Sequence, residues 1–121
     1  MSYHYVFVYG TLKKGYPNHR YLENSDFMGN ATINGTLLDI GSFPALLPKK
    51  EGDNSQVIGE VYGIDNETLA NLDSLEGEGI MYHRKSTGVI FTGPCYHLSK
   101  VCHTYFWGLS QDYEVIASGE W

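Results

Sequence analysis

Positive charge is scarce in this chain of 121 residues, which has 8 lysine and arginine residues against 14 aspartate and glutamate residues and a formal net charge of −6. The basic residues are scattered along the chain, whereas nucleic-acid-binding proteins gather them into a patch that neutralises phosphates. We therefore do not expect nucleic acid as a partner.

Long apolar runs are also missing from the sequence. No segment approaches the roughly 20 consecutive apolar residues of a membrane-spanning helix, and the first residues do not have the pattern of a secretory signal. The sequence predicts a soluble, cytoplasmic protein without a membrane partner. Its length is that of one domain, which we expect to comprise residues 1–121.

Cysteine is rare, with only Cys95 and Cys102 present. In a reducing compartment we expect two free thiols rather than a disulfide. His97 and His103 lie close to them in sequence, but adjacent residues of a strand point to opposite faces, so Cys102 and His103 cannot bind one ion. We expect no metal site. Phosphate-binding glycine motifs and serine nucleophile motifs are absent as well, so the sequence predicts no cofactor.

Glycine and aromatic residues are plentiful, with 14 glycines and ten tyrosines. Runs of β-branched and aromatic residues predict strands at residues 4–9, 26–33, 35–40, 56–64, 82–91 and 100–107. Asn34-Gly35 is interpreted as a tight turn or a bulge, residues 41–45 as a bend around Pro44, and residues 49–55 as a polar loop. The pattern of residues 108–121 does not predict their structure.

One long helix is predicted at residues 66–76, with Asp65 or Asn66 as its N-cap and Gly77 at its end. A second, short helix is predicted at residues 17–23. Six or seven strands are more than a small open sheet usually holds. The predicted fold is therefore α+β, a small mixed β-barrel, closed or nearly closed, with one or two flanking helices.

Glu76 is the unusual residue of the long helix. It lies one turn beyond Leu72 and two turns beyond Leu69, on the apolar side of the helix. Partial burial and the negative end of the helix dipole both raise the pKa of such a carboxyl group, and a group that titrates near pH 7 can exchange protons with a substrate. Alternatively, Glu76 turns into solvent at the helix end or pairs with Arg84 or Lys85.

The second candidate element is the loop Tyr9-Gly10-Thr11-Leu12, which follows the first predicted strand. Because Gly10 can adopt unusual dihedral angles, consecutive backbone N–H groups can turn outward together and bind a carboxylate or an oxyanion. Alternatively, the loop is an ordinary connection between a strand and the next segment.

Five segments of the sequence resemble the γ-glutamylcyclotransferase-like family, which includes γ-glutamylamine cyclotransferases and AIG2-like plant proteins. They are Val-Phe-Val-Tyr-Gly-Thr-Leu-Lys-Lys-Gly (6–15), Asn-Gly-Thr-Leu-Leu-Asp-Ile-Gly-Ser-Phe-Pro-Ala-Leu (34–46), Gly-Glu-Val-Tyr-Gly-Ile (59–64), Leu-Asp-Ser-Leu-Glu-Gly (72–77) and Tyr-His-Arg (82–84). Each segment is short, but five in the same order make a specific signal.

The resemblance implies a small barrel with a cavity between residues 9–12 and the end of the long helix. It implies that Tyr9, Gly10, Thr11 and Leu12 hold a γ-glutamyl group through backbone donors and that Glu76 is the general acid/base. Two weaker candidates are Tyr82, which would line the pocket, and Arg84.

The implied reaction cyclises a γ-glutamyl amine or γ-glutamyl amino acid to 5-oxoproline and releases the free amine. The α-amine of the substrate attacks its own γ-carbonyl, so the enzyme needs only a proton carrier and an oxyanion site. A small-molecule γ-glutamyl substrate is the expected partner. The leaving amine stays open: a lysine side chain, an α-amino acid, cysteinylglycine or another amine.

Two other readings of the sequence remain. A non-catalytic small-ligand-binding or protein-interaction domain would keep the barrel and the cavity without turnover. A purely structural β-domain would use the amides of residues 9–12 for hydrogen bonds within the protein.

Overall fold

The computed structural model describes residues 3–79, 81–93, 99–109 and 113–121. Seven strands, one 3₁₀ helix and one α-helix are found in this part of the chain. In chain order they are β1 (Tyr3–Val8), η1 (Pro17–Leu22), β2 (Asp26–Asp39), β3 (Pro44–Pro48), β4 (Gln56–Asp65), α1 (Asn66–Glu76), β5 (Tyr82–Phe91), β6 (Ser99–Trp107) and β7 (Glu114–Val115).

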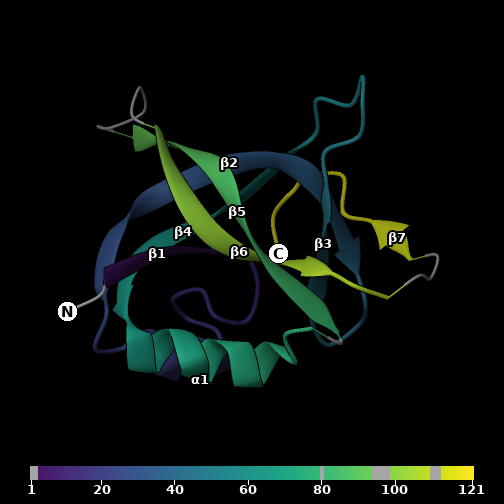
Figure 1. Ribbon diagram of the computed structural model, residues 1–121. Helices are drawn as coiled ribbons and strands as arrows, with labels where there is room; N and C mark the ends of the chain where they lie inside the picture. Colours follow the sequence, from purple (N-terminus) through teal and green to yellow (C-terminus); the bar gives the residue numbers. More distant parts are fainter. Residues whose placement is uncertain (1–2, 80, 94–98, 110–112) are drawn as a thin grey trace.

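Five of the strands close into a barrel in the order β2-β4-β1-β6-β5, because β5 pairs back with β2 at Ala31 and Thr32. β1 runs parallel to β6, and the other neighbouring pairs in the barrel are antiparallel. The predicted small mixed β-barrel is thus confirmed. Figure 1 shows β2 arching across the barrel on the side opposite to α1.

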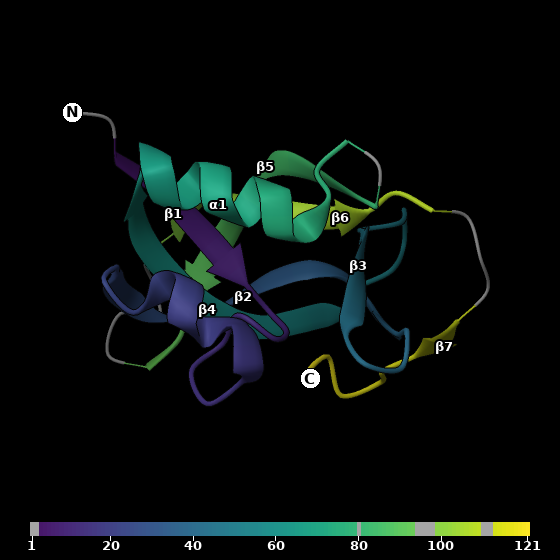
Figure 2. The same cartoon turned by 90° about the horizontal axis from the view of Figure 1, so that it is seen from below.

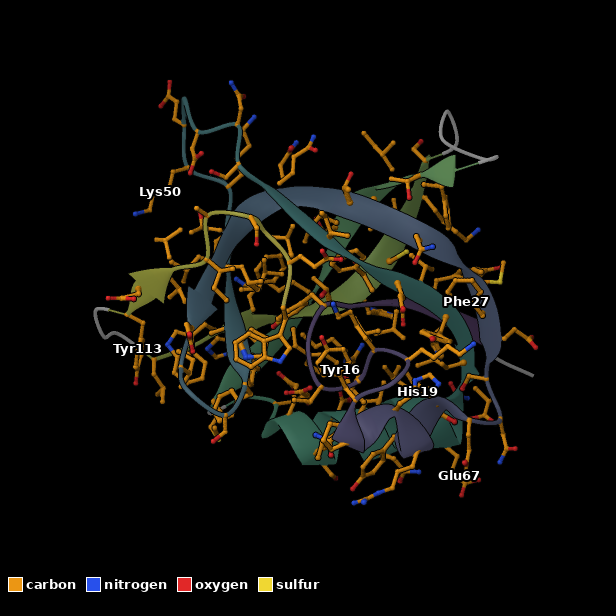
Figure 3. The ribbon with its side chains drawn as sticks, turned by 180° about the vertical axis from the view of Figure 1, so that it is seen from behind. Tyr16, His19, Phe27, Lys50, Glu67 and Tyr113 are labelled. Carbon is orange, nitrogen blue, oxygen red and sulfur yellow. The ribbon has the colours of Figure 1, made fainter. Side chains whose placement is uncertain are left out.

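The two helices lie on the same side of the barrel (Figures 1 and 3). α1 has the predicted bounds: the carboxylate of Asp65 accepts a 2.8 Å hydrogen bond from the N–H of Thr68, and Gly77 ends the helix with a φ of 62°. The predicted short helix is the 3₁₀ helix η1. Figure 2 shows the loop after β1 turning back toward η1 on this side. Neither described helix has the length and apolar character needed to cross a membrane.

The predicted break at Asn34-Gly35 was wrong, because β2 continues through it as one strand. What changes there is the partner: Asn34 pairs with Gln56 of β4, and Gly35 pairs with Pro48 of β3. Gly35 is suited to this position since an added Cβ would lie 2.8 Å from the carbonyl oxygen of Leu47. The glycine therefore permits close approach of two backbones rather than a reversal of the chain.

The prediction that residues 41–45 form only a bend was also wrong in part, since Pro44 begins β3. β3 hydrogen-bonds to β2 alone, so it is an edge strand, where a residue without an N–H group is tolerated.

No strand occupies 49–55, and the predicted polar loop is confirmed. The tail folds onto the barrel, with β7 pairing with β2 and Ile116 donating a 2.8 Å backbone hydrogen bond to Leu37.

The core has two parts, one inside the barrel and one between the barrel and the helices. Phe7 of β1 belongs to the first, and its neighbours Val6 and Val8 belong to the second, together with Leu69 and Leu72 of α1. Because β1 alternates between two buried faces, the expectation of a buried central strand is confirmed. This strand leads directly into the loop of residues 9–12.

Candidate active site

A cavity of about 340 Å³ lies between the loop after β1, the end of α1 and the start of β5. Its size falls within the usual range for small-molecule sites. All six predicted site residues line it, namely Tyr9, Gly10, Thr11, Leu12, Glu76 and Tyr82. Closure of the barrel thus brings residues 9–12 beside Glu76 and Tyr82, which are far from them in sequence.

Glu76 is half-buried on the wall of this cavity. Burial raises the pKa of its carboxyl group from the ordinary value of 4.5 to about 7, in the predicted direction. The structure does not bear out the alternative in which Glu76 pairs with Arg84 or Lys85. Arg84 instead donates a 2.8 Å hydrogen bond from Nε to Oδ1 of Asp73, and Lys85 is exposed.

The loop of residues 9–12 uses its carbonyl groups within the protein. The carbonyl of Gly10 accepts from the N–H of Lys13 at 3.0 Å, and that of Thr11 accepts from the N–H of Asn18 at 2.9 Å. Within the described part of the chain, by contrast, the N–H groups of Gly10, Thr11 and Leu12 donate no hydrogen bond. Because these residues line the cavity, their N–H groups are candidate donors to a ligand, whereas a purely structural domain would be expected to use them within the protein.

Gly10 is required for a different reason from the one that the sequence suggested. Its φ is not in the positive range. An added Cβ would instead lie 2.6 Å from Cγ and 2.8 Å from Cδ of Pro44, at the start of β3. The glycine therefore lets the loop after β1 pack directly against Pro44, which also lines the cavity.

Tyrosine hydroxyls brace the walls of the cavity. Tyr82 donates a 2.9 Å hydrogen bond to the carbonyl of Pro44, and Tyr9 donates a 2.5 Å hydrogen bond to the carbonyl of Tyr105. Burial, as the largest cause, raises the pKa of Tyr9 and Tyr82, and the nearby Glu76 carboxylate contributes to the rise of both. Both tyrosines are therefore neutral donors at physiological pH.

Tyr105 lines the cavity but was not a predicted site residue. It stands in an ordinary strand sequence, and only the pairing of β6 with β1 and β5 brings it beside Tyr9 and Arg84. Its hydroxyl donates a 2.7 Å hydrogen bond to Oδ1 of Asp73. Arg84, a weaker candidate from the sequence, does not line the cavity and contacts this same oxygen.

Cys102 and His103, the described members of the cysteine and histidine cluster, do not line the cavity. Cys102 is a buried free thiol whose pKa is raised to about 11 by burial, whereas the half-buried His103 contacts Arg84. Cys95 and His97 lie outside the described residues. Among the residues that are described, no group of three or more histidine, cysteine, aspartate or glutamate side chains is arranged to hold a metal ion.

Comparisons with known proteins agree on one family. A sequence profile described as Gamma-glutamyl cyclotransferase, AIG2-like matches residues 6–121. A Vibrio cholerae protein named as a gamma-glutamylcyclotransferase is 37% identical over 120 residues. The match covers 98% of this chain and 95% of that protein. The gamma-glutamylaminecyclotransferase of Rattus norvegicus is 35% identical over 94 residues, which are 70% of this chain and 62% of the relative.

Solved structures show the same similarity. The crystal structure of an AIG2-like protein from Mus musculus superimposes with a TM-score of 0.75 at 32% sequence identity. The match covers 88% of this chain and 78% of the mouse chain. The barrel and the flanking helices are thus those of known proteins of this kind.

Proposed function

The chain belongs to the Gamma-glutamyl cyclotransferase, AIG2-like family, and from that membership we propose that it cyclises a γ-glutamyl amine or γ-glutamyl amino acid to 5-oxoproline and releases the free amine. It is an enzyme of the cyclotransferase type, as its named relatives indicate. The leaving amine, for example a lysine side chain or an α-amino acid, is to be identified by assay with different substrates.

The substrate supplies its own nucleophile in this reaction. Its α-amine forms a bond to the γ-carbonyl carbon, a five-membered lactam closes, and the bond from that carbon to the leaving nitrogen breaks. One proton must leave the α-ammonium group before attack, a second leaves the nitrogen as the ring forms, and the departing amine must gain one. The enzyme therefore has to fold the substrate, move protons and stabilise a transient oxyanion.

We assign the proton transfers to Glu76. A carboxyl group with a pKa of about 7 populates both its acid and its base form near neutral pH, so it can accept a proton from the substrate and return one to the leaving nitrogen. The position of Glu76 on the cavity wall is the observation that carries the proposal. A site that only bound ligands would have no need of a desolvated carboxyl group beside a row of amide donors.

We assign binding of the γ-glutamyl unit to the loop of residues 9–12. The three N–H groups of Gly10, Thr11 and Leu12 are suited to the α-carboxylate of the substrate or to the oxyanion that forms at its γ-carbonyl. In this proposal Tyr9 and Tyr82 shape the cavity around the folded substrate. Their hydroxyls are committed to main-chain carbonyls, which favours a positioning role over proton transfer.

The proposal is tested by incubating the protein with a panel of γ-glutamyl amines and γ-glutamyl amino acids and measuring 5-oxoproline release. We expect product from at least one of them and a loss of about 10²- to 10⁴-fold in kcat for Glu76→Gln, the usual contribution of general acid/base catalysis. Glu67→Gln is the matched control, because Glu67 is exposed in the first turn of the same helix (Figure 3).

Two results would contradict the proposal. Full activity of Glu76→Gln would remove that residue from the mechanism. Binding of γ-glutamyl compounds by the wild-type protein without any 5-oxoproline would identify the chain as a non-catalytic binding domain instead.

A further inference from the structure

Asp73 connects the last part of α1 to the barrel. Its Oδ1 accepts two hydrogen bonds, one of 2.8 Å from Nε of Arg84 on β5 and one of 2.7 Å from the hydroxyl of Tyr105 on β6. Both members of the ion pair are largely shielded from water, with 28% of the Arg84 side chain and 26% of the Asp73 side chain exposed. One oxygen atom therefore ties the helix to two strands.

This polar contact lies beside the last turn of α1, which is less buried than the middle of the helix. The buried residues of the helix are Leu69 and Leu72, whereas Leu75 and Glu76 in the last turn are only half-buried. Gly77 then ends the helix. Because helix ends fray unless something holds them, a contact from Asp73 is well placed to fix the turn that carries Glu76.

Asp73 and Glu76 are three residues apart, a spacing that puts side chains on the same side of a helix with their Cβ atoms about 5–6 Å apart. Tyr105 interacts with both carboxyl groups. Burial is the largest cause of the rise in the pKa of its hydroxyl, and the charges of Asp73 and Glu76 raise it further. Tyr105 also lines the cavity, and its backbone carbonyl accepts a hydrogen bond from the hydroxyl of Tyr9. The contact at Asp73 is thus continuous with the cavity wall.

We infer that Asp73 and Arg84 are positioning residues that, with the Tyr105 hydroxyl, hold the Glu76 carboxyl group in the cavity and compensate the charge beside it. This inference rests on the proposed role of Glu76. It accounts for two of the sequence segments noted above, since Asp73 belongs to Leu-Asp-Ser-Leu-Glu-Gly and Arg84 to Tyr-His-Arg. The mechanism itself uses neither residue.

Charge balance gives the inference a distinctive consequence. Without Arg84, the Asp73 carboxylate becomes an uncompensated like charge one turn from Glu76 and raises the pKa of Glu76. Without the charge of Asp73, Arg84 becomes an uncompensated positive charge and lowers the pKa of Glu76. A charge at this distance in a partly hydrated site shifts a pKa by about 0.5 unit.

The other groups around these residues do not obscure the effect. Tyr9, Tyr82 and Tyr105 face Glu76 with pKa values raised by burial, so they stay neutral through pH 8. His103 contacts Arg84 through Nδ1 at 3.4 Å, and its pKa is lowered by burial and by the charges of Arg84 and His4. This lowering of its pKa favours the neutral form of His103 where Glu76 titrates.

The test measures kcat, KM and the pH dependence of kcat for Asp73→Asn and Arg84→Gln. We expect kcat to fall about 10- to 100-fold in both, with little change in KM, because displacement of a proton-transfer group by about 1 Å has this effect. The rise of activity with pH moves to lower pH in Asp73→Asn and to higher pH in Arg84→Gln. A purely structural role would not shift the two profiles in opposite directions.

Further variants control for charge and folding. Arg84→Lys keeps the charge and should retain the wild-type pH profile with an intermediate kcat. Tyr105→Phe removes one hydroxyl alone, so it tests the contact should Asp73→Asn fold poorly. Lys85→Gln, at the exposed neighbour of Arg84, removes one positive charge outside the ion pair and should match the wild type.

The outcomes separate this inference from the proposed function. If the wild-type protein forms 5-oxoproline and the two profiles do not move apart, the positioning role is refuted and the function stands. If the wild-type protein forms no product, the proposed function is refuted. An NMR titration of the Glu76 carboxyl carbon, which needs no turnover, then decides the positioning role by the same opposite shifts in its pKa.

Discussion

The hydroxyl of Tyr82 donates a 2.9 Å hydrogen bond to the carbonyl of Pro44, which joins the first residue of β5 to the first residue of β3 across the cavity. The backbone of Gly10 packs against the ring of Pro44. The two are so close that a side chain at position 10 would clash with this ring. The loop of residues 9–12 and the start of β5 both contact this one proline, which fixes their relative position. Glu76 lines the same cavity, so these contacts fix part of the wall around its carboxyl group.

Tyr82→Phe should widen the cavity without unfolding the protein. The ring packs edge-on against Trp107, with centroids 5.2 Å apart, and this contact is kept. Loss of the hydroxyl removes one buried hydrogen bond, which corresponds to about 1 kcal/mol of stability. We expect a several-fold higher KM with a smaller change in kcat. Steady-state kinetics and thermal unfolding measure the two effects, and an unchanged KM would exclude Tyr82 from shaping the site.

Gly10→Ala should impair activity more than stability. The new Cβ would lie 2.6 Å from Cγ of Pro44, so either the loop or β3 must move. Such crowding costs about 1–3 kcal/mol of stability, and a shift of about 1 Å in the loop donors should lower kcat/KM about 10²-fold. Gly88→Ala is the control, because a Cβ there meets no atom of the described part of the chain within 4 Å. Equal kinetics for both variants would contradict the proposed role of the loop.

The stability of the protein should depend on pH through Glu76. Its pKa is about 7 in the folded protein against an ordinary value of 4.5, so the folded state binds the proton more tightly. The resulting stabilisation is fully present below about pH 4.5 and is lost as the pH rises through 7. Because the group is only half-buried, we expect an effect of about 1–3 kcal/mol.

Glu76→Gln isolates this contribution. The amide cannot ionise, so the variant should be more stable than the wild type at pH 8 and similar to it at pH 4.5. Denaturant unfolding at several pH values measures the difference, with the exposed Glu67→Gln as control. A difference between Glu76→Gln and the wild type that does not vary with pH would show that Glu76 is well solvated when ionised.

Gly119→Ala should loosen the C-terminal segment from the barrel. Gly119 is buried with a φ of 72°, and an added Cβ would lie 2.0 Å from the carbonyl oxygen of Gln56. Gly93→Ala is a matched control with a φ of 76° and no atom of the described residues within 4 Å of its Cβ position. Backbone strain of about 1 kcal/mol is common to both variants, so a greater loss of stability in Gly119→Ala reports the clash. Equal unfolding free energies would contradict this account.

This segment also reaches the loop after β1. The carbonyl of Trp121 accepts hydrogen bonds from Nζ of Lys13 at 3.1 Å and from the hydroxyl of Tyr16 at 2.9 Å, and Tyr16 is labelled on that loop in Figure 3. The sequence of the tail predicted none of this, because its polar composition has no periodicity from which to place a strand or a contact.

The local features of the fold followed from the sequence. The bounds of α1 were predictable because the N-cap Asp65 and the terminal Gly77 act on the residues next to them. The inward direction of Glu76 followed from helical periodicity in the same way. These features depend on interactions within one or two turns, which a single segment of sequence contains.

Only the tertiary structure decided which distant groups meet. Arg84 forms its ion pair with Asp73 rather than with Glu76, and Tyr105 lines the cavity. Gly10 and Gly35 permit close approach of neighbouring segments rather than turns of the chain. Each of these outcomes depends on the register of strands that are far apart in the chain. Pairing between such strands is set by closure of the whole barrel and its core, and no local pattern of residues encodes it.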